Sequence, residues 1–161
     1  MEYLLSVQKL NLLSVNNAVN NIMIEEENCE GLKKSIENYN NFDIRKMANE
    51  LKNHPLRKFR AISAQLFNKN GDFEKALELL KNDEMYEEMI KTVSLSKSRN
   101  RAEDLLSFFI KQENEYFVAA TLFDCRSLIR PHVAIEVAWK KGMSECAMPF
   151  VIQSVFNFEK K

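Results

Sequence analysis

One apolar spacing, i, i+3, i+4, i+7, recurs along most of this chain and predicts a series of short amphipathic helices. Each set of four apolar residues falls on one helix face, because an α-helix has about 3.6 residues per turn. The sets are Ile44, Met47, Ala48 and Leu51; Phe59, Ile62, Ser63 and Leu66; Phe73, Ala76, Leu77 and Leu80; Tyr86, Met89, Ile90 and Val93; Ala102, Leu105, Leu106 and Phe109; Tyr116, Ala119, Ala120 and Phe123; Pro131, Ala134, Ile135 and Ala138; and Met143, Cys146, Ala147 and Phe150.

The first residues of these sets lie 12 to 16 positions apart, so two successive helices form a unit of about 30 residues. Such a repeat is typical of an α-solenoid, which buries a continuous core between neighbouring layers and forms an elongated stack. Before Ile44 the pattern is less regular, and helices are expected at 3–11, 14–26 and 30–39. The fold class predicted is all-α.

Several turn and capping residues stand at the ends of the predicted helices. Glycine suits the left-handed position after a helix, and Asp or Asn can accept a hydrogen bond from the free N–H groups of the next one. These residues are Gly71 with Asp72, Asp83, Asn100 with Glu103 as a capping box, and Asn114.

The composition narrows the classes of function. Lys plus Arg equal Asp plus Glu at 23 each, so no net charge would attract nucleic acid or an anionic membrane surface. The three cysteines, Cys29, Cys125 and Cys146, are widely spaced without a CxxC motif or secretory signal, which indicates reduced thiols inside the cell. The longest apolar-rich run, 116–123, is far shorter than the roughly 20 residues of a membrane span.

Candidate chemistry is sparse. The chain has three scattered glycines and no phosphate-binding or dinucleotide-binding glycine motif. His54 and His132 have no ligand partners at metal-site spacing, so neither metal nor cofactor is expected. The acidic runs 25–27 and 87–88 suit solvated helix faces, and the dispersed lysines suit solubility better than a basic groove for an acidic helix. We interpret Tyr116, Phe117 and Phe123, and the thiols of Cys125 and Cys146, as core residues. Binding or structural work is favoured over catalysis.

The stretch LIRPHVAIEVAW, residues 128–139, is interpreted as a structural joint. Pro131 suits the first position of a helix, because that position needs no N–H donor, and it holds Arg130 extended. His132 then faces water, whereas Trp139 is expected to pack against the next layer.

From Cys146 to Phe158 apolar residues occupy nearly the whole helix circumference, with Pro149 either opening the final helix or kinking it. Such a helix is buried on all sides or binds a partner. Self-association of a fragment is one interpretation, and a terminal cap docked on its own solenoid is the other.

The stretches ENYNNFD (37–43), LFDCRSLIRPHVAIEVAW (122–139) and AMPFVIQ (147–153), together with SVQKLN and SVNNAVNNIMIEEE near the start, resemble the clathrin heavy-chain family over essentially the whole chain. The resemblance implies a right-handed α-solenoid of stacked antiparallel helical hairpins. Residues 1–142 would end the proximal leg, and 143–161 would begin a truncated trimerisation, or hub, helix.

That resemblance implies a structural coat protein of endocytosis and intracellular transport, at the cytoplasmic face of coated pits and vesicles. Its partners would be other heavy chains, in a trimer and a lattice, and the clathrin light chain, which lies largely upstream; no nucleic acid or membrane insertion is implied. The family carries cysteines near the trimer contact; Cys125 matches one, whereas Phe117 and Thr121 stand where others are expected. The candidate hub contacts are Cys125, Phe150, Val151, Val155, Phe156 and Phe158.

Two other classes stay open. A vesicle-tethering scaffold of the vacuolar-sorting type would share the periodicity but lack the paired RPHVAIEVAW and AMPFVIQ motifs. A helical enzyme fragment would need titratable residues converging in a pocket.

Overall fold

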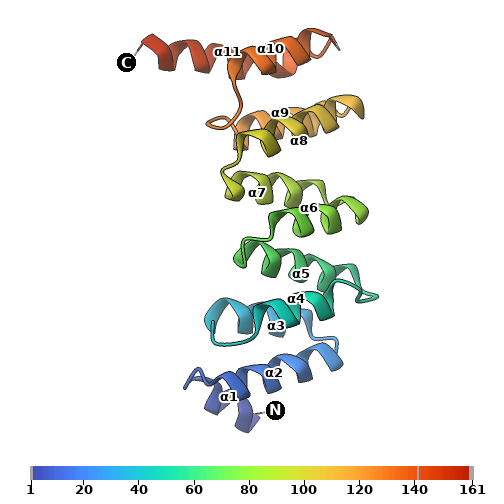
Figure 1. The fold of residues 1–161 in the computed structure, drawn as a ribbon, viewed down its shortest axis with the longest axis vertical. Coiled ribbons are helices and arrows are strands. Elements are labelled where there is room, and N and C mark those ends of the chain that lie inside the picture. Colours follow the sequence, from blue (N-terminus) through green and yellow to red (C-terminus); the bar gives the residue numbers. More distant parts are fainter. Residues whose placement is uncertain (1, 141, 160–161) are drawn as a thin grey trace. The chain divides into compact units, whose positions relative to one another are not determined.

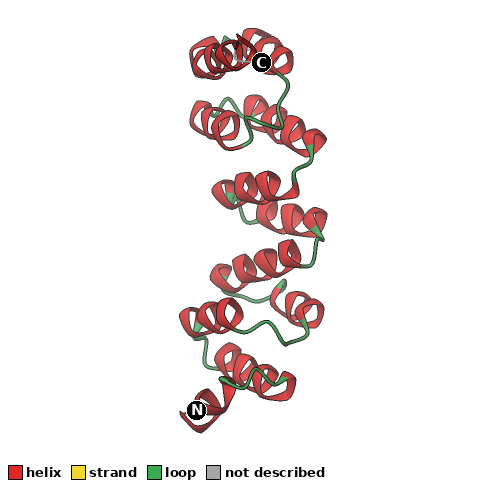
Figure 2. Cartoon of the chain, turned by 90° about the vertical axis from the view of Figure 1, so that its left-hand side faces the viewer, coloured by secondary structure: helices red, strands yellow, loops and turns green. Residues whose placement is uncertain are grey.

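Helices form every regular element of the described part of the chain, which in this computed structural model comprises residues 2–140 and 142–159. The side chains at positions 2, 3, 137, 138, 140 and 157–159 are not among those described. Short turns join the helices (Figure 2), and neither described range contains a strand. The predicted all-α class is confirmed.

The chain divides into two units, Met1–Leu79 and Leu80–Lys161, with the boundary inside α6 (Phe73–Asn82). The first unit runs from blue to green in Figure 1. It contains α1 (Glu2–Gln8), α2 (Leu13–Glu25), α3 (Cys29–Asn38), α4 (Ile44–Leu51) and α5 (Arg57–Lys69). Successive helices pack against each other, α1 on α2, α2 on α3 and α4 on α5, and α3 also contacts α5.

The first three helices share a polar seam inside the first unit. Gln8 donates from Nε2 to Ser35 Oγ over 2.7 Å, and Ser35 Oγ donates to Asn20 Oδ1 over 2.5 Å. All three side chains are buried. A second set of asparagines joins the α1–α2 turn to the α3–α4 turn, where Asn16 Nδ2 donates to Asn11 Oδ1 over 2.8 Å and to the Asn41 carbonyl over 2.9 Å. Polar contacts therefore hold the irregular N-terminal helices in register.

The second unit contains α7 (Tyr86–Ser96), α8 (Arg99–Lys111), α9 (Glu115–Asp124), α10 (Pro131–Lys140) and α11 (Ser144–Glu159). Helices α7, α8 and α9 contact one another, α10 contacts α8 and α11, and α11 returns to α9. An aromatic cluster lies at the centre of the first three, with the Phe109 ring 5.5 Å from Tyr86 and 5.2 Å from Phe117 between centroids. Phe109 is completely buried, so this cluster anchors the unit.

The predicted helix starts agree with the structure to within three residues from position 44 onward. Asn114 caps α9 as predicted, because its side chain accepts a hydrogen bond from the Phe117 N–H over 3.3 Å. Two other predicted caps are wrong: α7 follows Met85 rather than Asp83, and α8 follows Ser98, which places Asn100 inside the helix. Helix α7 therefore starts two residues later than its predicted cap implies, and α8 starts two residues earlier.

Left-handed residues end several helices. Gly71 has φ +83°, as predicted. Because the chain has only three glycines, non-glycine residues take the same conformation at five other turns: Asn11, Glu27, Glu84, Lys97 and Glu113.

Candidate interaction surface

Helix α9 has apolar residues on two opposite sides, and the structure buries the side that the periodicity did not select. Val118, Thr121 and Leu122 face the interior, whereas Tyr116 is 66% exposed and Phe123 is 71% exposed. The predicted assignment of Tyr116 and Phe123 to the core is therefore wrong. Both faces of the helix are apolar, so spacing alone could not decide which would be covered. Phe117 lies at the edge and joins the aromatic cluster.

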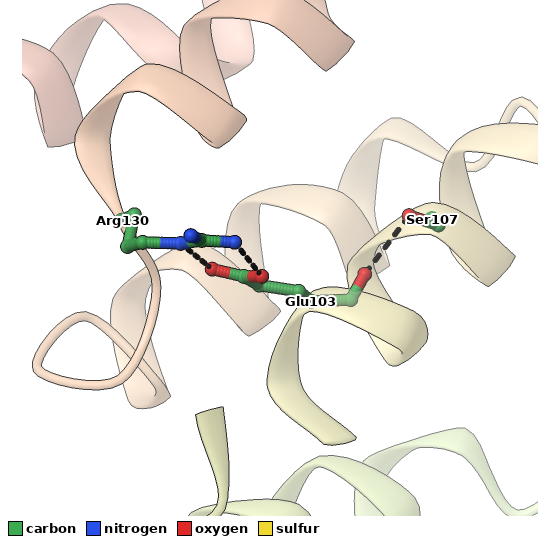
Figure 3. Close-up of polar contacts among 3 residues, drawn as sticks. All are labelled: Glu103, Ser107 and Arg130. Atoms are coloured by element: carbon green, nitrogen blue, oxygen red, sulfur yellow. Dashed lines mark hydrogen bonds and ion pairs between the residues drawn. The ribbon is translucent and has the colours of Figure 1, made fainter. Parts of the chain in front are cut away.

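Arg130 links the connection after α9 to helix α8. Its guanidinium donates from Nε and from an Nη atom to the two carboxylate oxygens of Glu103, each over 2.8 Å (Figure 3). Glu103 was predicted to cap its own helix, and this was wrong. It lies about one turn inside α8, which begins at Arg99, and Ser107 Oγ donates to the Glu103 backbone carbonyl over 2.9 Å. The bidentate pair orients the start of α10 against α8.

The ion pair also changes the acidity of both groups. The hydrogen bond from Arg130 lowers the pKa of Glu103, against a smaller opposing effect of burial. The same bond raises the pKa of Arg130. Both groups are therefore charged throughout the neutral range, and the pair persists there.

Helix α10 begins at Pro131, as predicted, and His132 is exposed to water, also as predicted. Trp139 does not pack against a neighbouring layer: it is 81% exposed, so that prediction is wrong. Ala134 provides the described buried contact on this helix, and Ile135 is exposed.

Helix α11 continues through Pro149, which lies inside it rather than opening it. Ala147 and Phe150 are buried, and Val151 is half-buried. Four apolar side chains point outward, Met148, Ile152, Val155 and Phe156, all at least half exposed. The side chain of Phe158, a predicted hub contact, lies outside the described residues. This outward apolar face of α11 is a candidate interaction surface.

The cysteines of this unit differ in accessibility. Cys125 is completely buried, and burial, with a smaller effect from Asp124, raises its pKa to about 11. Cys146 is half-exposed rather than a core residue; burial raises its pKa, as do Glu115 and Glu145. Neither is activated as a nucleophile.

Residues 2–140 and 142–159 contain no group of His, Cys, Asp and Glu arranged to hold a metal ion. A helix long and apolar enough to cross a membrane is likewise not found in this part of the chain. The Glu103–Arg130 pair is a contact within the second unit that the sequence did not predict.

Comparison with known proteins is consistent with this architecture. Residues 1–116 match the Clathrin family, described as a region in clathrin and VPS proteins. Over 159 residues, 99% of this chain, the sequence is 39% identical to the probable clathrin heavy chain 1 of Caenorhabditis elegans, 10% of which is covered. Over the same length it is 37% identical to clathrin heavy chain 2 of Homo sapiens, covering 10%, and 36% identical to the clathrin heavy chain of Dictyostelium discoideum, covering 9%. The chain spans about a tenth of the length of these relatives.

Proposed function

Because this chain belongs to the clathrin family of helical-repeat proteins, we propose that it is a structural segment of a vesicle coat, stiffening the leg of a clathrin-type heavy chain and providing contacts at its hub. Its role is scaffolding rather than catalysis. The proposal assigns residues 1–142 to the end of the proximal leg and 143–161 to the start of the hub helix.

The packing of the helices supports the role in leg rigidity. Each interior layer is filled by large side chains that are completely buried, such as Phe59 and Ile62 in α5 and Leu106 and Phe109 in α8. Close-packed interiors resist deformation, because changes in helix spacing open voids. A chain of such layers transmits force along a leg without a mobile joint at each repeat.

The outward face of α11 carries the proposal for the hub. Ala147 and Phe150 fix the helix to its own unit, which leaves Val155 and Phe156 exposed at 55% and 60%. An exposed apolar helix face of this kind suits contact with a second heavy chain. Val151 is half-buried and Phe158 remains a predicted contact, whereas the side chains of Cys125 and Phe150 are buried in the unit and are not exposed to a partner.

The remaining parts of the proposal concern partners and location. Other heavy chains, in a trimer and lattice, are the main partners, and a clathrin light chain is a second partner along the leg. The segment would act at the cytoplasmic face of coated pits and coated vesicles, without inserting into the membrane or binding nucleic acid.

A vesicle-tethering scaffold is the second candidate function, because the matching family also includes VPS proteins. The identity of 36% to 39% with clathrin heavy chains over 99% of the chain favours the coat role.

A graft tests the coat role. The matching 159 residues of the Caenorhabditis elegans heavy chain would be replaced by this chain, and coat assembly would be followed by electron microscopy. We expect closed coats from the graft. A graft that keeps its helical circular dichroism but forms no coats would refute the coat role.

Two variants of the graft test the hub contact separately. Val155→Ser combined with Phe156→Ser should reduce assembly at least tenfold, whereas Leu95→Ser on α7, a leucine that is 65% exposed, should leave it unchanged. Equal assembly by both variants would refute the contact through α11 and leave the coat role standing.

A further inference from the structure

A pocket of about 460 Å³ lies in the first unit, where the α2–α3 turn and the first residues of α3 approach the start of α5. Its apolar lining comprises Cys29 and Phe59, which are buried, and Leu56, which is exposed. The volume falls within the range of about 300 to 1,000 Å³ that is typical of small-ligand sites. The whole lining belongs to the first unit, so the pocket is not part of the proposed hub contact on α11.

Charged side chains of opposite sign line this pocket. Glu27 and Glu30 come from the α2–α3 turn and the start of α3, and Arg57 and Lys58 come from the first turn of α5. All four residues are exposed. Among the described residues, none of these four side chains takes part in an ion pair. Their charges therefore remain available to a partner.

The other lining residues are engaged in the fold and hold the pocket in place. The Asn28 side chain accepts a hydrogen bond from the Gly31 N–H over 2.9 Å and so caps α3. The Phe59 side chain is completely buried, and its ring lies 4.3 Å from the His54 ring between centroids. A pocket whose frame is fixed beforehand loses little conformational entropy when it binds a ligand.

The lining selects an occupant that carries both signs of charge. A purely anionic occupant would meet the carboxylates of Glu27 and Glu30, and a purely cationic one would meet Arg57 and Lys58. Such like-charge contacts disfavour either kind of partner. An extended peptide places alternate side chains on one face. One face can therefore present an acidic, an apolar and a basic side chain in succession.

We propose that this pocket binds an extended segment of a partner protein in which an acidic, an apolar and a basic residue occupy alternate positions. The acidic residue pairs with Arg57 and Lys58, and the basic residue pairs with Glu27 and Glu30. The apolar residue between them contacts Leu56. This binding goes beyond the proposed coat role and does not rest on it.

Four synthetic peptides with capped ends test the proposal on the 161-residue chain. Two carry opposite charges, as Asp-Ser-Leu-Ser-Lys and as Lys-Ser-Leu-Ser-Asp, since the segment can run in either direction. The two controls are Asp-Ser-Leu-Ser-Asp and Lys-Ser-Leu-Ser-Lys. Binding is measured by NMR titration of the backbone amide signals.

We expect one of the oppositely charged peptides to bind at least threefold more tightly than either control and to shift the signals of residues 27–30 and 56–59. Its affinity should fall as salt is raised, because the paired groups are exposed. Equal binding by a control peptide, no binding by either oppositely charged peptide, or shifts confined to other residues would overturn the proposal.

Charge variants locate the site. Arg57→Gln with Lys58→Gln leaves an acidic lining, so this variant should prefer the peptide with two lysines. Glu27→Gln with Glu30→Gln leaves a basic lining and should prefer the peptide with two aspartates. All four positions are exposed, so helical circular dichroism should be unchanged.

The matched control removes two positive charges from the same unit outside the pocket. Lys34→Gln with Lys52→Gln changes two exposed lysines that do not line the pocket, and it should keep the preference of the wild type. Pocket variants that keep the preference of the wild type, or a control that changes it as much as they do, would overturn the assignment of the site.

Discussion

The loss of stability on mutating the buried polar seam between α1, α2 and α3 should depend on how many of its side chains are replaced. Ser35 Oγ accepts from Gln8 and donates to Asn20, and these side chains are 4%, 2% and 0% exposed. One hydroxyl therefore pairs with both the Gln8 Nε2 donor and the Asn20 Oδ1 acceptor. An apolar side chain can take the place of Ser35 without a large loss of stability only if Gln8 and Asn20 are also replaced by apolar residues.

Replacing Ser35 with alanine removes both hydrogen bonds and leaves the Gln8 Nε2 donor and the Asn20 Oδ1 acceptor buried without this partner. Each such group costs about 1 to 3 kcal/mol, so we expect the free energy of unfolding to fall by about 2 to 6 kcal/mol. The triple variant Gln8→Met, Asn20→Leu, Ser35→Ala removes all the polar groups at similar volume. We expect it to lie within about 1 kcal/mol of the wild type.

Urea unfolding followed by circular dichroism measures both free energies, and amide hydrogen exchange shows whether the loss is confined to α1–α3. The control is Ser14→Ala, a serine that is exposed on the same helix as Asn20. A loss below about 0.5 kcal/mol for Ser35→Ala, or a triple variant as unstable as the single one, would refute the reasoning.

Four further results are expected. Phe109→Ala should destabilise the second unit by about 3 to 5 kcal/mol in thermal unfolding, because its completely buried ring leaves a cavity; a loss below about 1 kcal/mol would contradict this. Glu113→Gly should stabilise by about 0.5 to 1 kcal/mol, because φ is +54° there, and a lower melting temperature would contradict it. Cys125, with a pKa of about 11 and no exposure, should react with iodoacetamide at neutral pH only after denaturation, as read by peptide mass mapping; modification of the native chain would oppose this. The pKa of Glu103 is lower in the folded chain than its usual value of 4.5, so its ion pair stabilises the fold above pH 4.5 and loses this effect as pH falls through the folded pKa. The difference in melting temperature between the wild type and Glu103→Gln should therefore shrink in acid. A difference that stays constant with pH would argue against this.

The helices from Ile44 onward could be predicted because each has apolar residues at helical spacing, and the repeat of about 30 residues followed from their order. Helices α9 and α10 mark where this reasoning fails. Their apolar residues surround the axis, so periodicity could not show that Tyr116 and Trp139 would be exposed. Only the neighbouring helices decide which side is covered.

Polar contacts between residues far apart in the sequence also could not be predicted from local sequence patterns. Glu103 and Arg130 are separated by 27 residues, and Glu103 fitted a local capping box equally well in the sequence. The same holds for Gln8 and Ser35, also 27 residues apart. Such partners can be recognised only once the helices are stacked, because neither residue type nor spacing selects one distant acceptor from several.

Trimerisation is the central claim about this segment, and sedimentation equilibrium of the grafted heavy chain measures it most directly. The Caenorhabditis elegans heavy chain carrying these residues in place of its matching stretch should sediment with the mass of three chains. The Val155→Ser, Phe156→Ser variant of that graft should sediment as a single chain. A graft with normal helical circular dichroism that sediments as one chain would contradict the account.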